Sequence, residues 1–456
     1  MNKNKYSKKM VGSGEEMLKV SPDAAGIDIG SKEHYVAVPA DRCQEPVRAF
    51  GCFTPDLHKM AKWLKSCAVK TVAMESTGVY WVPVVQVLEQ YGFNVKLVDA
   101  RQTKNVPGRK TDVLDCQWIQ RLHSYGLLQA AFIPDKEIRV LRSYWRHRDE
   151  LVKSCARQIH LMQKALEQMN IQLHKVLSDI SGLSGMRIIR MITKGDHDPH
   201  RLASLAHGSV KASKEMIAAA LLGDYHREHL FALTQAVELY DIYQEKLLKC
   251  DAEIESYMNS LNSKKDPDQL GPRPGSKRRK NQPHFDLTSH LYRITGVDLT
   301  RIDGIDSMTA QTVISECGFD MSRFPTIKHF TSWLALCPNN QITGGKVRKR
   351  GTKKVKNRAA DALRISAMTL HSSKTALGAY YRRMRTRLGA PKAITATAHK
   401  LARIIYNMLK HGNDYADRGQ EYYEKQYKDR VIKSLKRRAR ELGMCLVSTE
   451  TGEFVS

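Results

Sequence analysis

The sequence lacks the features of a membrane-spanning or secreted protein. No apolar run reaches the roughly 18 residues that a transmembrane helix needs, and the segment from Met1 to Met10 is polar and lysine-rich, without the apolar stretch of a secretory signal. The nine cysteines are an odd number and contain no Cys-x-x-Cys pair, which argues against a structural zinc site. We therefore expect free thiols in a reducing compartment, a cytoplasmic location and no membrane partner.

Acidic residues are also scarce. Against 74 Lys and Arg the chain has 47 Asp and Glu, so its formal net charge is +27. An excess of this size favours a polyanionic partner, most often nucleic acid. With 456 residues the chain is long enough for two or three domains.

The first part of the chain alternates short apolar segments with amphipathic ones. After a flexible basic lead-in over residues 1–22, we expect strands at 24–29, 34–38, 47–53, 70–74 and 94–98, and helices at 55–66, 81–91 and 112–122. The second strand follows the first as closely as in a hairpin, and the later strands alternate with helices. This order predicts a mixed α/β sheet in a first domain over residues 23–134.

Residues 135–262 carry almost no strand signal. Apolar residues recur there at helical spacing, which predicts long helices, as in a coiled-coil arm, with the Met and aromatic side chains in its core. A Pro/Gly-rich basic stretch breaks this pattern at 263–285 and is typical of a disordered linker. The charges of this linker could also lie along a phosphate backbone.

A second, α-helical domain is expected at 286–412. Near its start, an apolar residue, a turn containing Gly304 and a helix resemble half of a helix-hairpin-helix, a motif that offers backbone N–H groups to phosphates. Asp306 stands where that motif has its second glycine, so a plain helical turn is the alternative. The tail at 413–456 is basic, and either contacts nucleic acid or is a solubilising helix.

A basic run follows a Thr-Gly-Gly turn in this second domain. From Lys346 to Arg358 there are eight basic residues and no acid. A charge run is often only a solvated face, but the flexible turn before it favours a loop that contacts DNA or RNA. The residues that we expect to bind nucleic acid are Gly304, Lys346, Arg348, Arg350, Lys353, Lys354 and Arg358.

Four carboxylates stand out in this basic chain. Asp112 and Asp115 lie three residues apart, so a helix that begins there places both on one face. Asp28 lies inside one apolar run and Glu75 ends another, and a charge in a buried strand is unfavourable unless it is paired or bound to metal. Convergent acids of this kind suit Mg²⁺ or Mn²⁺ and two-metal phosphodiester chemistry. The alternatives are an exposed helix start, favoured by the helix dipole, and strand-end acids that reach solvent.

These residues resemble one known family. Gly26-Ile27-Asp28, Glu75-Ser76-Thr77-Gly78 and Lys110-Thr111-Asp112 with Asp115 match the DEDD insertion-sequence transposases, which are insertion-sequence family one-ten and include the Piv-type DNA invertases. Later segments resemble the second domain of that family, and look most like its eleven-eleven subgroup: Ile302-Asp303-Gly304-Ile305, Thr309-Ala310, Phe324, Trp333 to Pro338, Thr343 to Lys346 and Lys356 to Ala360. The resemblance covers about residues 24–133 and 290–415.

The resemblance implies a RuvC-like, RNase H-type N-terminal domain in which Asp28, Glu75, Asp112 and Asp115 bind Mg²⁺ or Mn²⁺. It also implies an α-helical C-terminal transposase domain whose serine attacks DNA and holds it covalently. The expected partners are donor and target DNA, a non-coding bridge RNA, and further copies of the chain in a dimer or tetramer. The location would be the bacterial cytoplasm, in association with the nucleoid when DNA is bound.

One departure from the family concerns the nucleophile. Thr343 occupies the position of the family's serine, and its hydroxyl can also act as a nucleophile, although threonine is stiffer. Asp99, which closes the strand at 94–98, is either a fifth ligand or a helix-start acid. The leading hypothesis is a metal-dependent DNA recombinase. The alternatives are a junction-resolving nuclease that does not need Thr343, and a non-catalytic nucleic-acid-binding protein.

Overall fold

The computed structural model describes residues 18–76, 78–99, 111–271, 279–349, 351–353 and 355–447. Most of the predicted lead-in lies outside the described residues. Residues up to Ile133 and residues from Pro134 onward form two compact units. Among the described helices, none is long and apolar enough to cross a bilayer. All nine cysteines are free.

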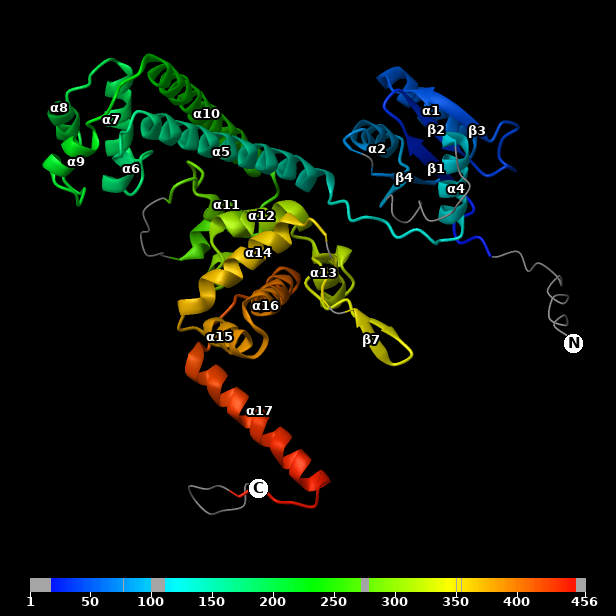
Figure 1. Ribbon diagram of the computed structural model, residues 1–456. Coiled ribbons are helices and arrows are strands. Elements are labelled where there is room, and N and C mark those ends of the chain that lie inside the picture. Colours follow the sequence, from blue (N-terminus) through cyan, green and yellow to red (C-terminus); the bar gives the residue numbers. More distant parts are fainter. Residues whose placement is uncertain are drawn as a thin grey trace, which may run out of the picture. The chain divides into compact units, whose positions relative to one another are not determined.

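The first unit contains the mixed α/β sheet that the sequence predicts. Its elements are β1 (Ala24–Ile29), β2 (Glu33–Ala37), β3 (Val47–Gly51), α1 (Thr54–Ser66), β4 (Thr71–Glu75), α2 (Trp81–Gln90), β5 (Asn94–Val98) and α4 (Asp112–Ser124). The five-stranded sheet has the order β3-β2-β1-β4-β5. The pairs β1–β2 and β2–β3 are antiparallel, and the pairs β1–β4 and β4–β5 are parallel (Figure 1).

The two faces of this sheet bury different side chains. Successive residues of a strand point to opposite faces, and Ala25, Ile27 and Ile29 pack with the buried residues of α1 and α2 in one apolar core. On the other face, Ala73 of β4 packs with Ile119 of α4 in a smaller cluster. The sheet therefore has a large apolar core on one side and α4 on the other.

Gly26 lets α4 lie directly against β1. A Cβ atom at this position would stand 2.3 Å from the backbone N of Gln120 and 2.5 Å from the backbone O of Cys116. Real Cβ atoms do not approach other atoms this closely. The absence of a side chain at Gly26 thus sets the distance between the helix and the strand.

We expect Gly26→Ala to destabilise the first unit strongly. The added methyl meets helix backbone rather than a movable side chain, so the loss should reach the upper part of the ~1–3 kcal/mol typical of overpacking. Thermal unfolding of the purified protein measures it. Gly208→Ala is the matched control, because nothing lies within 4 Å of that added Cβ. Equal melting temperatures for the two variants would contradict the close approach.

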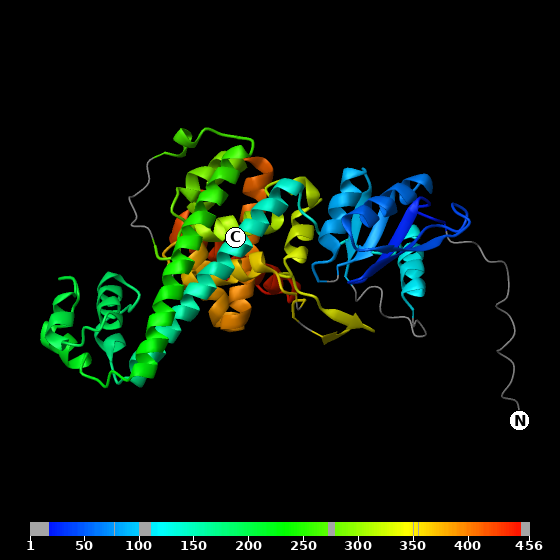
Figure 2. The same cartoon turned by 90° about the horizontal axis from the view of Figure 1, so that it is seen from above.

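Two long helices organise the second unit, as predicted for residues 135–262. α5 (Lys136–Gln168) and α10 (Arg227–Ser260) lie side by side as an antiparallel pair, and four short helices lie beyond one end of the pair (Figures 1 and 2). Those helices are α6 (Leu173–Val176), α7 (Leu183–Thr193), α8 (Pro199–Ser204) and α9 (Lys214–Ala220). A buried ion pair joins the long helices, with Arg148 Nε 2.5 Å from Asp251 Oδ1.

Most apolar positions of this helical region are buried, as their spacing predicts. Met162, Met169 and Trp145 belong to the core. Leu239 and Ile242 are exposed, although they fit the same helical spacing. Spacing identifies the apolar stripe of a helix, but it does not say whether a second element covers that stripe.

The stretch at 263–285 differs from the prediction of a disordered linker, because its described parts pack against their neighbours. Residues 267–270 form a short 3₁₀ helix, η1 (Pro267–Leu270), whose Leu270 is buried. Lys280 Nζ donates a hydrogen bond to Asp179 Oδ2 at 2.7 Å. The backbone N of His284 donates to Asp251 Oδ2 at 3.1 Å. These contacts satisfy polar groups that composition alone assigns to solvent.

The remaining helices belong to the same unit, and α12 (Ser307–Cys317) among them packs against α5. The others are α11 (Leu287–Thr295), η2 (Leu299–Arg301), η3 (Met321–Arg323), α13 (Ile327–Trp333), α14 (Arg358–Thr369), η4 (Leu370–Ser372), α15 (Ala376–Leu388), α16 (Ala390–His411) and α17 (Gly419–Glu441). Arg146 of α5 holds Glu316 of α12 through two hydrogen bonds, of 2.8 and 2.7 Å. Between α13 and α14, β6 (Gln341–Thr343) and β7 (Lys346–Lys349) form a hairpin that projects from the helices (Figures 1 and 2).

Candidate active site and nucleic-acid interface

Two of the predicted acids lie side by side at the end of the parallel strands. β1 and β4 pair with Ile27 opposite Met74, so the next position in this register places Asp28 beside Glu75. Because side chains alternate along a strand, both acids share the face of Gly26 and Ala73, which α4 covers. The register of two strands thus brings together residues that are far apart in the sequence.

The other two acids lie in the first turn of α4. Thr111 has extended backbone, and its side-chain oxygen accepts a hydrogen bond from the backbone N of Leu114 at 3.4 Å, so the helix begins at Asp112. Asp112 and Asp115 are favoured there by the positive end of the helix dipole. The same close packing at Gly26 that positions α4 also positions its acidic first turn.

The electrostatics of Asp28 show that the four carboxylates are close together. Burial, followed by the charges of Asp112, Glu75 and Asp115 in that order, raises the pKa of Asp28 to about 6. Like charges at short range disfavour the ionised form. The structure therefore gathers all four sequence-predicted acids at one place in the first unit.

These acids fit a hard divalent cation in their chemistry. All their donor atoms are carboxylate oxygens, which suit Mg²⁺ or Mn²⁺ better than softer metals. Among the described residues, no three His, Cys, Asp or Glu side chains lie as close together as the ligands of one ion. The spacing of the carboxylates is wider than a bound ion would impose, and metal binding by these acids stays a prediction.

Two neighbours of the acids escaped the sequence analysis. Tyr35 of β2 lies directly opposite Asp28 in the antiparallel register. The Tyr35 hydroxyl donates a hydrogen bond to the Glu33 carboxylate at 3.3 Å. The pKa of Tyr35 is raised, chiefly by the charge of Glu33 and also by that of Asp112. Cys116 of α4 is buried, and burial, then the charge of Asp28, raises the pKa of its thiol to about 12. If the sequence analysis had assigned the residue pairs of the β1–β2 hairpin, it would have placed Tyr35 beside Asp28.

Two side chains of α4 anchor the helix to the opposite end of these strands. Gln120 Nε2 donates to the backbone O of Ala24 at 3.2 Å, and His123 Nε2 lies 3.0 Å from Thr71 Oγ1. Burial, with a smaller effect of Lys96, lowers the pKa of His123 to about 4, so this ring is neutral at neutral pH. Asp99 follows β5 one residue beyond the position paired with Glu75.

We expect Asp28→Asn to raise the melting temperature in metal-free buffer above pH 6. The pKa of Asp28 in the folded protein is about 6, against an ordinary value of 3.8 for an aspartate, so the folded state binds the proton more tightly. Stability is then lost as the pH rises from about 4 to about 6, and an amide removes that loss. Calorimetry in EDTA at several pH values measures it. Asp41→Asn, at a mostly exposed side chain, is the control. An equal effect of Asp28→Asn at low and neutral pH would contradict the carboxylate cluster.

The predicted nucleophile lies at the turn of the projecting hairpin in the second unit. Thr343 pairs with Lys346, and the two residues between them, Gly344 and Gly345, have φ of 56° and 73°. Positive φ at both central residues of a two-residue turn is the type that joins hairpin strands, and glycine adopts it without strain. Thr343 is exposed, and within the described part of the chain its hydroxyl has no hydrogen-bond partner. The turn is thus a defined hairpin, rather than the flexible loop expected from the sequence.

The predicted nucleic-acid-binding residues divide into three groups. Lys346, Arg348 and Lys353 are exposed on or next to the hairpin. Arg350 and Lys354 lie outside the described residues. Arg358 differs, because its guanidinium lies 3.0 Å from Asp149 Oδ2 and 3.6 Å from Glu150 Oε1 of α5. The charge of Arg358 is therefore shared with acids of its own unit.

Gly304 lies in a packed turn within the second unit. It has φ of 83°, and an added Cβ would stand 3.0 Å from the backbone O of Ser366. Asp306, at the position of the missing second glycine, caps α12 by accepting a hydrogen bond from the backbone N of Thr309 at 2.9 Å. These contacts favour the plain helical turn, and phosphate binding at Gly304 stays a prediction.

We expect the combined removal of Arg348, Arg350 and Lys353 to weaken the salt dependence of DNA binding. Each phosphate contact contributes roughly −0.9 to the slope of log K against log salt on duplex DNA, so the slope should become less negative by about 2 to 3. Titrations at several salt concentrations give this slope. Arg358→Gln is the comparison variant, because it removes a cation that is already paired with acids of α5. An unchanged slope in the triple variant would mean that the run is only a solvated face.

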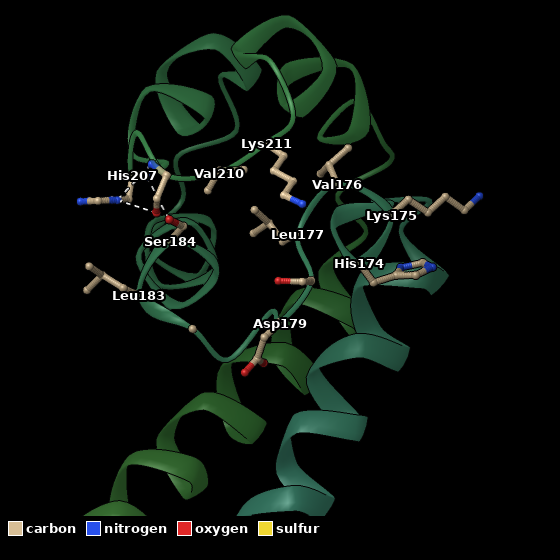
Figure 3. Close-up of a pocket in the computed structure, with 13 residues that line it drawn as sticks. His174, Lys175, Val176, Leu177, Asp179, Leu183, Ser184, His207, Val210 and Lys211 are labelled. Carbon is tan, nitrogen blue, oxygen red and sulfur yellow. Dashed lines mark hydrogen bonds between the residues drawn. The ribbon is translucent and has the colours of Figure 1, made fainter. Parts of the chain in front are cut away.

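A cavity lies elsewhere in the second unit. It has a volume of about 710 Å³ and lies among the short helices beyond the end of the α5–α10 pair. Figure 3 shows Ser184 and Lys211 beside it, with Ser184 hydrogen-bonded to the backbone N of His207. None of the sequence-predicted site residues lines this cavity. Thr343, Lys346 and Arg348 of the hairpin are exposed, as contact with a large polymer requires.

Comparison with protein families defines the class of this protein. A model described as Transposase, of the DEDD type from the IS110 family, matches residues 25–171, and a model described as Transposase IS116/IS110/IS902 family matches residues 298–382. The first match contains all four acids, and the second contains the hairpin. The chain is therefore a transposase, a class of enzyme that acts on DNA. The two matches together span just over half of the chain, which belongs to the IS110 family of insertion-sequence transposases. No curated protein matches it.

Proposed function

We propose that this transposase is a metal-dependent recombinase that cuts and rejoins DNA strands through a covalent hydroxyl–DNA intermediate. The observation that carries the proposal is the convergence of four carboxylates, three of which raise the pKa of Asp28. A structural role for such a cluster is disfavoured, because mutual repulsion destabilises the fold unless a cation compensates it. A RuvC-like fold for the first unit is part of the proposal, supported by acids on the central strands of a mixed sheet.

In this proposal Asp28, Glu75, Asp112 and Asp115 hold Mg²⁺ or Mn²⁺. The bound metal would polarise the scissile phosphate and favour the ionised form of the attacking hydroxyl. Thr343 supplies that hydroxyl, at a turn where two glycines allow the backbone to approach DNA closely. Lys346 and Arg348 then hold the negatively charged phosphate beside it.

The covalent step exchanges one phosphate ester for another. A bond forms between Thr343 Oγ1 and phosphorus, and the bond from phosphorus to one sugar oxygen breaks. The threonine proton is lost, and the leaving sugar oxygen gains a proton to become a hydroxyl. Attack by a sugar hydroxyl of the second DNA strand reverses these changes, so that the strands are rejoined and Thr343 is released.

Donor and target DNA are the substrates in this proposal, and a non-coding bridge RNA that pairs with both would select them. The RNA and a homo-oligomer of two or four subunits are supported by the resemblance to the family alone. Sequencing of the RNA that copurifies with the protein tests for the bridge RNA. Light scattering of the DNA complex tests for the homo-oligomer.

A junction-resolving nuclease is the second candidate, because the same four acids would also serve hydrolysis. Trapping on DNA separates the two functions. Incubation with cleavable DNA and Mg²⁺, followed by denaturation, should leave DNA attached to the protein at Thr343, as located by mass spectrometry of the peptides. A nuclease would release free ends with no adduct, and a non-catalytic binding protein would leave the DNA uncut.

A further inference from the structure

Two of the last three helices carry positive charge and no acid of their own. α15 and α16 together contain eight Lys and Arg and no Asp or Glu. α17 packs against α15, with Tyr423 as its only buried side chain. Arg382 of α15 donates to Gln420 Oε1 at 2.7 Å, which fixes the start of α17 on the face of α15.

Lys400 of α16 lies at the centre of this charge. Its Nζ lies 4.5 Å from the ring centroid of Tyr380 and 5.4 Å from that of Tyr423. The two rings meet edge to face, with centroids 6.1 Å apart. The lysine is thus held by aromatic faces, which attract a cation without neutralising it.

Other cations surround this lysine. Burial lowers the pKa of Lys400, and the charges of Arg430 and Arg403 lower it further. The guanidinium of Arg383 lies over the ring of Tyr427. We call Lys400, Arg403, Arg430, Arg383 and Arg387 the C-terminal cationic cluster. In the described part of the chain, no carboxylate forms an ion pair with any of these five residues.

Elsewhere in this unit the chain supplies an acid where a cation has a structural role. Arg148 is paired with Asp251, and Arg146 with Glu316. Arg358 is likewise paired with Asp149. A part-buried lysine among arginines without an acid is unfavourable in the isolated protein, since like charges repel and burial disfavours the charged form. An external anion would relieve both effects.

The observations favour a polymer with many phosphates over other anionic partners. The cations are spread over three helices, and beyond Arg430 the exposed part of α17 continues with Lys433, Arg438 and Arg440, while Arg437 is paired with Glu441. Tyr423 and Tyr427 of α17 pack on α15 and α16, and the exposed large apolar side chains of this helix are Tyr422 and Leu435. An extended set of cations with few exposed apolar side chains suits a phosphodiester backbone better than a membrane surface, which an amphipathic helix binds through a continuous apolar face.

We propose that the C-terminal cationic cluster binds phosphodiester groups of nucleic acid, as a site separate from the β6–β7 hairpin. All five of its residues lie beyond residue 382, where the second family match ends. This binding site and the recombinase activity proposed above have only nucleic acid as a partner in common. The site concerns binding rather than strand transfer, so either can fail while the other stands.

The test is the salt dependence of binding by the full chain. The variant K400Q/R403Q/R430Q and the wild type are titrated with duplex DNA and with single-stranded RNA between about 50 and 200 mM salt. If the cluster binds duplex DNA, the slope of log K against log salt should become less negative by roughly 2 to 3. If it binds single-stranded RNA, the slope should become less negative by about 2. Loss on DNA alone, on RNA alone or on both supports the site and identifies the polymer.

The matched control removes the same charge from another surface. Lys164, Lys194 and Lys246 are exposed, and K164Q/K194Q/K246Q should keep the wild-type slope. Equal slopes for the cluster and control variants would overturn the proposal. So would a loss of binding to phosphatidylserine vesicles with no change on either nucleic acid. If K400Q/R403Q/R430Q does not fold, the variant R387Q/R403Q takes its place, because it changes two exposed side chains. Its slope should become less negative by about 1 to 2.

Discussion

Asp115→Asn should abolish DNA strand cleavage, while the protein stays folded and still binds DNA. The proposed metal site depends on the negative charge of its oxygen ligands, and the amide keeps the shape of the side chain without its charge. Several kcal/mol of transition-state stabilisation depend on a catalytic metal ion. A loss of about 4 kcal/mol corresponds to a rate lower by about 1,000-fold.

Cleavage of a labelled DNA substrate measures this effect, and Asp112→Asn should behave alike. Asp56→Asn is the matched control, since Asp56 is also an acid in the first turn of a helix of the same unit. Circular dichroism and DNA titration establish that each variant folds and binds. Normal recombination by both the Asp112→Asn and the Asp115→Asn proteins would rule out the proposed site.

Thr343→Val should abolish the proposed covalent protein–DNA adduct without weakening DNA binding. Valine keeps the β-branched shape, and the β-strand position of Thr343 next to the turn favours both residues equally. Only the hydroxyl is lost, so binding by Lys346 and the neighbouring cations should not change. Thr343→Ser should keep or raise the activity, because serine carries the same hydroxyl on a less restricted side chain.

Denaturing gels that detect DNA attached to the protein measure the adduct in each variant. A hydroxyl is a weak nucleophile unless a base or a metal activates it. Thr343 and the four acids belong to different units of the chain, so the hypothesis requires both units, from one subunit or from two, to meet around one phosphate. An adduct that persists in Thr343→Val would move the nucleophile to another residue.

Part of the candidate site was predictable because it depends on short-range order. The alternation of apolar residues placed β1 and β4, and Asp28 and Glu75 with them, because one face of a buried sheet needs period two. The spacing of Asp112 and Asp115, with Thr111 before them, placed both in the first turn of a helix.

Other parts depended on contacts that the sequence does not display. Tyr35 became part of the site through the pairing of β2 with β1. Arg358 belongs to a uniformly basic run, yet it is paired with acids of a helix about 200 residues away. The stretch at 263–285 reads as a linker from its composition, although Lys280 and His284 bind groups of the long helices.

The sequence by itself determined the identity and order of the four acids, the excess of positive charge, and the position of a turn at Gly344-Gly345. These features follow from residue type and local conformation, which need no partner elsewhere in the chain. Only the tertiary structure decided which charges meet. The strand register and the close approach of α4 at Gly26 gather the acids, while the packing of α15, α16 and α17 leaves Lys400 among cations. Electrostatic interactions depend on distance in space, and that distance is set by packing between segments far apart in the chain.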